Sequence, residues 1–154
     1  MDIRAATTSD LGALNDVIQR AIMNWQIPER VKRLSLPTLQ YDELDLQHFV
    51  ILVAETDDQV TAIAALDTAP QDIGQETRAL LLHGIYVDPA HQRQGIGRSL
   101  LSAMEEVAVQ KDAGALLVKA QKDAEDFYRS MGLQKLEDDK AGNGYAYRYW
   151  KAIA

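Results

Sequence analysis

The sequence of 154 residues contains no cysteine, which excludes disulfides, thiolate metal sites and cysteine nucleophiles. It contains no apolar run that approaches the roughly 20 residues required by a bilayer-spanning helix. The first ten residues, MDIRAATTSD, lack the basic and then apolar pattern of a signal peptide. We therefore expect a soluble, cytoplasmic protein with no membrane partner.

An excess of basic residues is also missing, since the net charge is −7 at pH 7. General binding to nucleic acid requires a basic surface that displaces counterions, so no nucleic-acid partner is expected. Residues 1–80 hold 13 acidic and 6 basic side chains, whereas residues 81–154 hold 10 of each. The first part would favour a cationic partner. The alternative is that its acidity serves only to keep the protein soluble.

The spacing of apolar residues predicts alternating strands and helices in a single mixed α/β domain over residues 1–154. The predicted strands are 3–5, 49–56, 60–69, 79–87, 115–120 and a final hairpin of 133–137 and 145–151. A long helix from Gly97 carries one apolar face, formed by Leu100, Leu101, Met104, Val107 and Ala108. A short helix over 124–131 is closed by Gly132. Residues 70–78 are expected to form a loop.

Two helices are predicted before the first long strand. Ser9 is placed as the N-cap of the first helix. Pro28 suits the first turn of the second helix, which has Val31 and Leu34 on one side. Pro37 interrupts any continuous helix over residues 35–48, because proline lacks the N–H of the helical ladder.

The segment HQRQGIGR, residues 91–98, lies where the strand 79–87 is expected to turn into the long helix. Gly95 and Gly97 allow a sharp bend and let a ligand approach the backbone. The start of a helix offers free N–H groups and the positive end of its dipole, which suits a phosphate. Arg93 and Arg98 add positive charge on either side.

Several interpretations of this turn compete. A tight turn without a ligand is one of them. A dinucleotide-binding fingerprint requires a third glycine, and that position is Leu100. A Walker loop requires Gly-Lys-Ser/Thr after its spacer, which the sequence lacks.

A fourth interpretation uses more of the chain. QRQGIG, residues 92–97, matches the Q/R-x-x-G-x-G/A pyrophosphate loop of the GCN5-related N-acetyltransferases, the GNAT superfamily, and IYVDPAHQRQGIGRSLL resembles that family's strand, turn and helix. AEDFYRSMGL, residues 124–133, resembles its second signature. The resemblance implies an α/β (α+β) GNAT fold, with a mixed, mostly antiparallel sheet of about seven strands flanked by helices. The sheet is expected to splay between the fourth and fifth strands, where acetyl-CoA binds.

The resemblance also implies roles for particular residues. Backbone groups of Ile85, Tyr86 and Val87 are expected to pair with the pantetheine arm. Tyr128 corresponds to the tyrosine that protonates the departing CoA thiolate; the alternative from its helical spacing is a core tyrosine. Gln121 replaces the asparagine that commonly binds the cofactor. The pyrophosphate loop and its flanks, with Gln92 bracing the loop, are expected to comprise Gln92, Arg93, Gln94, Gly95, Ile96, Gly97, Arg98 and Ser99. No metal is implied.

Acetyl transfer to an amine needs a base, because an ammonium has no lone pair. His83 is the leading candidate, four residues before Val87, and its reference pKa near 6.5 suits the task. The alternative is a histidine turned away from the cleft, since Gly84 is a candidate bulge that would change its face. Glu76 is the second candidate.

The acceptor pocket is expected between the first two helices, the 70–78 loop and the final hairpin. Aromatic residues in these regions are substrate contacts or sheet packing: Trp25, Tyr41, Tyr145, Tyr147, Tyr149 and Trp150. Asp42, Glu43 and Asp45 form a candidate site for a cationic acceptor, the alternative being an exposed acidic face. The expected activity is N-acetylation of a primary amine of a small molecule. The competing functions are an acyl-CoA sensor without catalysis and a protein-interaction domain, and homodimerisation through the final strands would fit their aromatic residues.

Overall fold

In the computed structural model, which describes residues 1–74, 77–136 and 147–153, seven strands form one sheet in the order β1-β2-β3-β4-β5-β7-β6. β4 and β5 run parallel, and the other five neighbouring pairs run antiparallel. The predicted mixed, mostly antiparallel sheet is therefore confirmed. The strands are β1 (Asp2–Ala5), β2 (Phe49–Thr56), β3 (Gln59–Gln71), β4 (Ala79–Val87), β5 (Ala115–Ala120), β6 (Gln134–Lys135) and β7 (Tyr147–Ala152).

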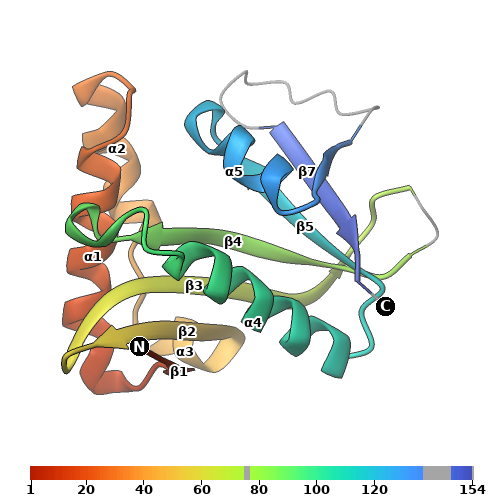
Figure 1. Ribbon diagram of the computed structural model, residues 1–154, viewed down its shortest axis with the longest axis horizontal. Helices are drawn as coiled ribbons and strands as arrows, with labels where there is room; N and C mark the ends of the chain where they lie inside the picture. Colours follow the sequence, from red (N-terminus) through yellow and green to blue (C-terminus); the bar gives the residue numbers. More distant parts are fainter. Residues whose placement is uncertain (75–76, 137–146, 154) are drawn as a thin grey trace.

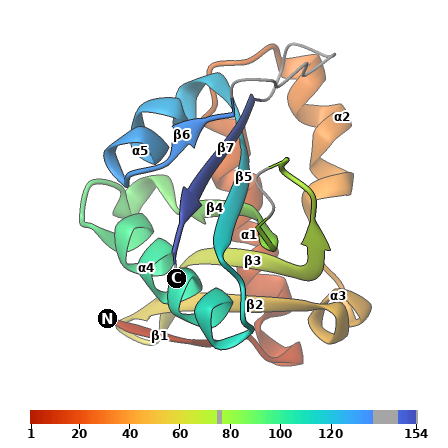
Figure 2. The same ribbon diagram turned by 90° about the vertical axis from the view of Figure 1, so that its right-hand side faces the viewer.

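Helices cover both faces of the sheet (Figures 1 and 2). α1, α2 and α3 lie on one face, and α4 and α5 lie on the other. Their bounds are α1 (Leu11–Met23), α2 (Glu29–Leu39), α3 (Glu43–His48), α4 (Ile96–Gln110) and α5 (Glu125–Ser130). No helix in the described part of the chain is long and apolar enough to cross a membrane.

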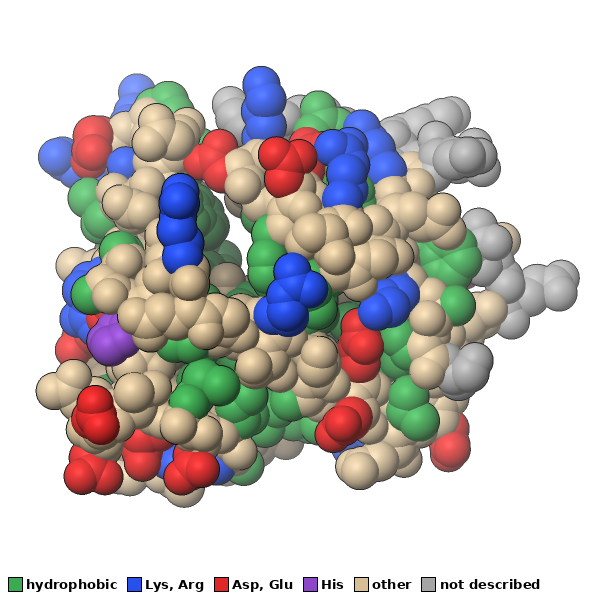
Figure 3. Space-filling view, in the orientation of Figure 1, with side chains coloured by type: hydrophobic (Ala, Val, Ile, Leu, Met, Phe, Trp, Pro, Cys, Tyr) green, Lys and Arg blue, Asp and Glu red, His purple; other side chains and the backbone are tan. Residues whose placement is uncertain are grey.

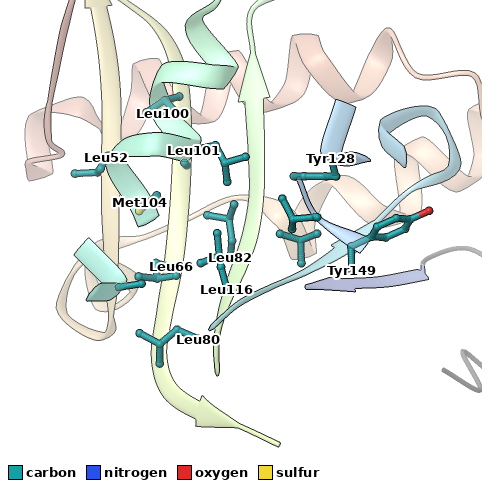
Figure 4. Close-up of a cluster of buried hydrophobic side chains, with 14 of the residues drawn as sticks. Leu52, Leu66, Leu80, Leu82, Leu100, Leu101, Met104, Leu116, Tyr128 and Tyr149 are labelled. Atoms are coloured by element: carbon teal, nitrogen blue, oxygen red, sulfur yellow. The ribbon is translucent and has the colours of Figure 1, made fainter. Parts of the chain in front are cut away.

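The core on the α4 side confirms the helical period of the sequence. Leu100, Leu101 and Met104 of α4 are fully buried. They point toward the leucines of the sheet, as Figure 4 shows, and Tyr128 and Tyr149 lie in the same cluster. Burying each leucine contributes roughly 1.5–3 kcal/mol relative to leaving it exposed. This packing fixes α4, and with it the turn that precedes the helix.

The start of α1 differs from the prediction. Ser9 does not cap the helix, because residues Thr8–Asp10 form a 3₁₀ turn that precedes α1. The Thr7 backbone N–H donates to the Asp10 carboxylate at 2.7 Å. Arg4 also donates to this carboxylate at 2.7 and 2.9 Å, and its hydrogen bonds lower the pKa of Asp10 well below its ordinary value. Asp10, and not Ser9, is therefore the last residue before α1. Its ion pair with Arg4 joins two different elements, a contact that helix spacing does not encode.

The apolar side predicted for α2 is wrong at Leu34, whereas Val31 is half-buried. Leu34 is 67% exposed, whereas Lys32 is only 6% exposed. The Lys32 ammonium donates to the Met23 carbonyl at 2.9 Å and so caps the C-terminus of α1. The helix also continues through Pro37 to Leu39. Proline lacks the N–H that would donate to the carbonyl of residue 33, so the helix passes Pro37 with one ladder hydrogen bond fewer.

The sheet opens between β4 and β5 as predicted. Pairing runs from Ala79↔Ala115 to Leu82↔Val118 and then stops. Beyond Leu82, β4 remains paired with β3 on its other side. The edge of β4 that faces β5 therefore has no strand partner there, and Figure 1 shows the two strands diverging toward α1 and α2.

A β-bulge lies in β4 at His83. Adjacent residues of β3 pair with Gly84 and Leu82, so His83 has no residue opposite it. Because of this extra residue, the side chains after the bulge lie on the faces of the sheet opposite to those that simple alternation would give. Leu82 and Ile85 consequently both pack on the α4 side, and Tyr86 packs on the α1 side. The predicted bulge at this position is confirmed.

Candidate active site

A cavity of about 790 Å³ occupies the opening between β4 and β5. The corner between α1 and α2 bounds it on one side, and the segment leading into α5 bounds it on the other. Figure 3 shows this face of the molecule hollowed between these two parts. The cavity brings together residues from both predicted signatures and the predicted base: His83, Ile85, Tyr86, Gln92, Arg93, Gln121 and Tyr128.

The glycine turn leads directly into α4. Arg93 and Gly95 both have positive φ angles, 64° and 78°. A Cβ added at Gly95 would meet no atom within 4 Å, so its left-handed backbone, and not crowding, favours glycine there. α4 begins at Ile96, one residue earlier than predicted. The turn thus presents the N-terminus of a 15-residue helix beside the cavity.

The other residues expected at the cofactor are not part of the cavity lining. Gly97 packs closely on α5, because an added Cβ would lie 3.4 Å from the Phe127 ring. Ile96 is buried in the core on the α4 side. The remaining members of this group are Val87, Gln94, Gly95, Arg98 and Ser99. Their contacts with a cofactor stay a prediction.

Tyr128 belongs to both the core and the cavity. Its side chain is 5% exposed, and its ring meets Phe127 edge-on at 5.2 Å between centroids. Burial raises the pKa of Tyr128 well above 10, and the neighbouring Tyr86 raises it further. Burial likewise raises the pKa of Tyr86 to about 12. Both phenols therefore stay protonated at neutral pH and can donate to an anion in the cavity.

His83 faces three ionisable groups from three different elements. Its Nε2 atom lies 3.8 Å from a carboxylate oxygen of Asp67 on β3, and its ring contacts Phe49 at 4.6 Å between centroids. Burial lowers the pKa of His83, against the opposing effect of Asp67. Lys119 of β5 lowers the pKa further and Asp45 of α3 raises it. The imidazole is therefore neutral, and a competent base, at neutral pH.

Asp67 is a site residue that the sequence analysis missed. It directly follows the apolar run of β3, so the sequence alone does not distinguish it from an ordinary polar residue near the end of a strand. Its proximity to His83 depends on the bulge in β4, which no pattern within β3 reveals.

The corner between α1 and α2 forms the other wall. Trp25 stacks on Tyr86, with 6.2 Å between ring centroids. The Gln26 backbone N–H donates to the Asp123 carboxylate at 2.9 Å, which joins this corner to the segment before α5. A smaller cavity of about 230 Å³ adjoins the first and shares three lining residues with it: Trp25, Leu39 and Gln121.

Most of the other residues expected at the acceptor have structural roles. Tyr149 is fully buried and donates to Glu125 at 2.6 Å. Asp42 and Asp45 cap α3 reciprocally, at 3.0 and 2.8 Å. The residues expected at the acceptor that do not line the main cavity are Tyr41, Asp42, Glu43, Asp45, Tyr147, Tyr149 and Trp150. Glu76 and Tyr145 lie outside the described residues.

Comparison with known sequences decides the family. The sequence model of the Acetyltransferase (GNAT) family matches residues 19–133, a span that contains both signatures. The chain belongs to the GNAT family. Among curated relatives, this GNAT protein is 30% identical over 108 residues to an L-methionine sulfoximine/L-methionine sulfone acetyltransferase of Salmonella typhimurium strain LT2. The match covers 68% of this chain and spans 61% of that relative.

Solved structures share the GNAT fold over nearly the whole chain. The PaiA N-acetyltransferase of Thermoplasma acidophilum, crystallised in complex with coenzyme A, has a TM-score of 0.79 at 17% identity and covers 98% of both chains. A ribosomal-protein-alanine N-acetyltransferase of Brucella melitensis has a TM-score of 0.68 at 24% identity, over 99% of this chain and 100% of its own. The predicted family and fold are therefore confirmed.

Proposed function

We propose that the protein transfers an acetyl group from acetyl-CoA to a primary amine of a small molecule. The observation that carries the proposal is the cavity itself. It joins Arg93 of the first signature, Tyr128 of the second and the neutral imidazole of His83. Membership of the GNAT family supports the use of acetyl-CoA, and the acetyltransferase activity of the Salmonella relative supports the reaction class.

The described residues suit the donor acetyl-CoA. The unpaired edge of β4 at Ile85–Val87 offers backbone groups to the amides of the pantetheine arm. Backbone N–H groups of the turn from Arg93 to Arg98 would hold the pyrophosphate, assisted by the helix dipole. Gln121 lines the cavity and offers a side-chain amide. The acetyl group would then lie between His83 and Tyr128.

The reaction would proceed by direct attack of the amine on the thioester carbonyl. His83 accepts the proton of the amine, and the new C–N bond forms as the C–S bond breaks. The Tyr128 hydroxyl donates its proton to the departing sulfur. Solvent then reprotonates Tyr128 and takes the proton from His83, so the products are the amide and free CoA. The cysteine-free chain offers no thiol for a covalent acetyl-enzyme.

Release of free CoA thiol, measured with acetyl-CoA and a panel of small primary amines, tests the proposal. We expect release that depends on both the amine and the protein. Binding of acetyl-CoA without thiol release for any amine would contradict it and favour an acyl-CoA sensor.

The pH profile tests the role of His83. A base acts only when unprotonated, so kcat/KM should fall as pH drops through the pKa of His83. Because burial lowers that pKa, the fall should lie below the ordinary histidine value near 6.5. His83→Gln should abolish this fall and reduce kcat/KM about 10²-fold on the plateau.

Asp67→Asn is the matched variant for this measurement. Removing its negative charge should move the fall to still lower pH while most of the plateau activity remains. A wild-type profile unchanged by His83→Gln would contradict the assignment and direct attention to Glu76 or to water.

A further inference from the structure

Lys119 places a positive charge on the α1 side of the opening between β4 and β5, the side on which we expect the acceptor. In β5, Leu116, Val118 and Ala120 pack on the α4 side, so the alternation of the strand directs Lys119 to the opposite side. Lys119 is exposed and lines the same cavity as His83. The pairing of β4 with β5 ends at Leu82↔Val118, so His83 and Lys119 are the next residues of the two strands, at the point where the strands part. The charge of Lys119 lowers the pKa of His83.

This charge forms no ion pair with an acidic residue in the described part of the chain. The cross-strand neighbour of Lys119 is the cation Arg148. Among the described residues that line the cavity, Asp123 is the one carboxylate, and it already accepts from the Gln26 N–H at 2.9 Å. Arg93 lies on the pyrophosphate turn. The part of the cavity beside Lys119 therefore favours an anionic group, whereas Asp67 and Asp45 oppose the effect of Lys119 on His83 and raise its pKa.

An apolar pocket lies next to this charge. The cavity of about 230 Å³ opens beside Trp25 and is mainly apolar, with Ser35, Thr38 and Gln121 as its polar members. Its apolar lining residues are Trp25, Ile27, Pro28, Val31 and Leu39. None of its described lining residues is acidic or basic. It suits an uncharged side chain of moderate size.

We propose that the acceptor is an α-amino acid with an apolar side chain, whose carboxylate binds Lys119. Its amine would face His83 and its side chain would occupy the pocket beside Trp25. The amine and carboxylate of an α-amino acid share one carbon, which matches the closeness of His83 and Lys119. This inference rests on the proposed function and adds a specificity-determining residue to it.

The carboxylate would also assist the base. Pairing with a carboxylate cancels the positive charge that lowers the pKa of His83. His83 would then accept the proton of the amine more readily in the complex than in the free protein. An amine without a carboxylate leaves Lys119 unpaired. It therefore gains neither the binding to Lys119 nor the rise in the pKa of His83.

The test compares L-leucine with L-leucinamide, which keeps the amine and side chain but replaces the carboxylate. We expect Lys119→Met, which keeps the length of the side chain, to lower kcat/KM for leucine by 10- to 100-fold and for leucinamide by less than threefold. Lys119→Arg should restore most of the activity with leucine. Comparing each variant with wild type on the same acceptor removes the difference in reactivity between the two amines.

The affinity for acetyl-CoA is the control and should stay unchanged in Lys119→Met. An equal loss of kcat/KM for both acceptors, or no loss for either, would overturn the inference. If neither of these acceptors releases thiol, the panel of amines still tests the proposed function, and calorimetry of leucine with the CoA-loaded protein tests the carboxylate site at Lys119 separately. Leucine binding that Lys119→Met abolishes would support it, and no leucine binding to the wild type would overturn it.

Discussion

Tyr128→Phe should lower kcat about 10²- to 10³-fold, the range typical of a lost general acid. The Kd for acetyl-CoA should change less than threefold, because the ring keeps its packing against Phe127 and loses only the hydroxyl. The size of the effect follows from the chemistry, since no other group is proposed to donate a proton to the sulfur. Single-turnover kinetics with saturating acetyl-CoA, beside calorimetry of the donor, would measure both quantities.

Tyr149→Phe is the matched control. Tyr149 is fully buried and belongs to the same core cluster as Tyr128, but its hydroxyl donates to Glu125 at 2.6 Å. Losing this hydrogen bond should reduce the free energy of unfolding by about 1–2 kcal/mol and leave kcat unchanged. A Tyr128→Phe enzyme with wild-type kcat, or one that no longer binds acetyl-CoA, would contradict the role of Tyr128 as the general acid.

Gly95→Val should weaken acetyl-CoA binding about 10²-fold, if it disrupts two charge-assisted hydrogen bonds worth roughly 1.5 kcal/mol each. The reason is conformational. Gly95 has a φ of 78°, which a β-branched residue adopts only with strain. The turn would rearrange, and the N–H groups from Arg93 to Arg98 would no longer converge on the pyrophosphate. Calorimetric titration of acetyl-CoA would give the change in Kd.

Gly74→Val separates this effect from general destabilisation. Gly74 has a φ of 74° and, like Gly95, open space around an added Cβ, but it does not line the cavity. Both variants should lose stability by at least about 1–2 kcal/mol, the cost of a side chain in left-handed backbone. Only Gly95→Val should lose affinity for acetyl-CoA. Equal affinities in the two variants would exclude the turn as the phosphate cradle.

The strands around the site could be predicted because their sequence patterns are local. The apolar runs ALLLHGIYV and ALLVKA gave β4 and β5 to the residue, since buried central strands are continuously apolar. The long helix was predicted to within one residue of its start because its apolar face repeats at helical spacing. The two GNAT signatures then fixed the family, and the splay of the strands followed from the family.

The contacts that tune the site could not be predicted, because they join residues far apart in the sequence. Asp67 approaches His83 only through the strand register and the bulge. Lys32 is buried because it reaches a carbonyl at the end of α1, whereas helical periodicity treats it as a surface charge. In the sequence, Lys119 is one polar residue in an apolar strand, and only the structure shows that it lines the same cavity as His83.

Calorimetric titration of acetyl-CoA into the purified protein, with CoA and ATP as comparisons, tests most directly whether the opening between β4 and β5 holds the donor. We predict saturable binding of acetyl-CoA and CoA and no binding of ATP, because ATP has phosphates and adenine but no pantetheine arm to pair with β4. Absence of acetyl-CoA binding, or equal binding of ATP, would contradict the assignment of this cavity as an acetyl-CoA site.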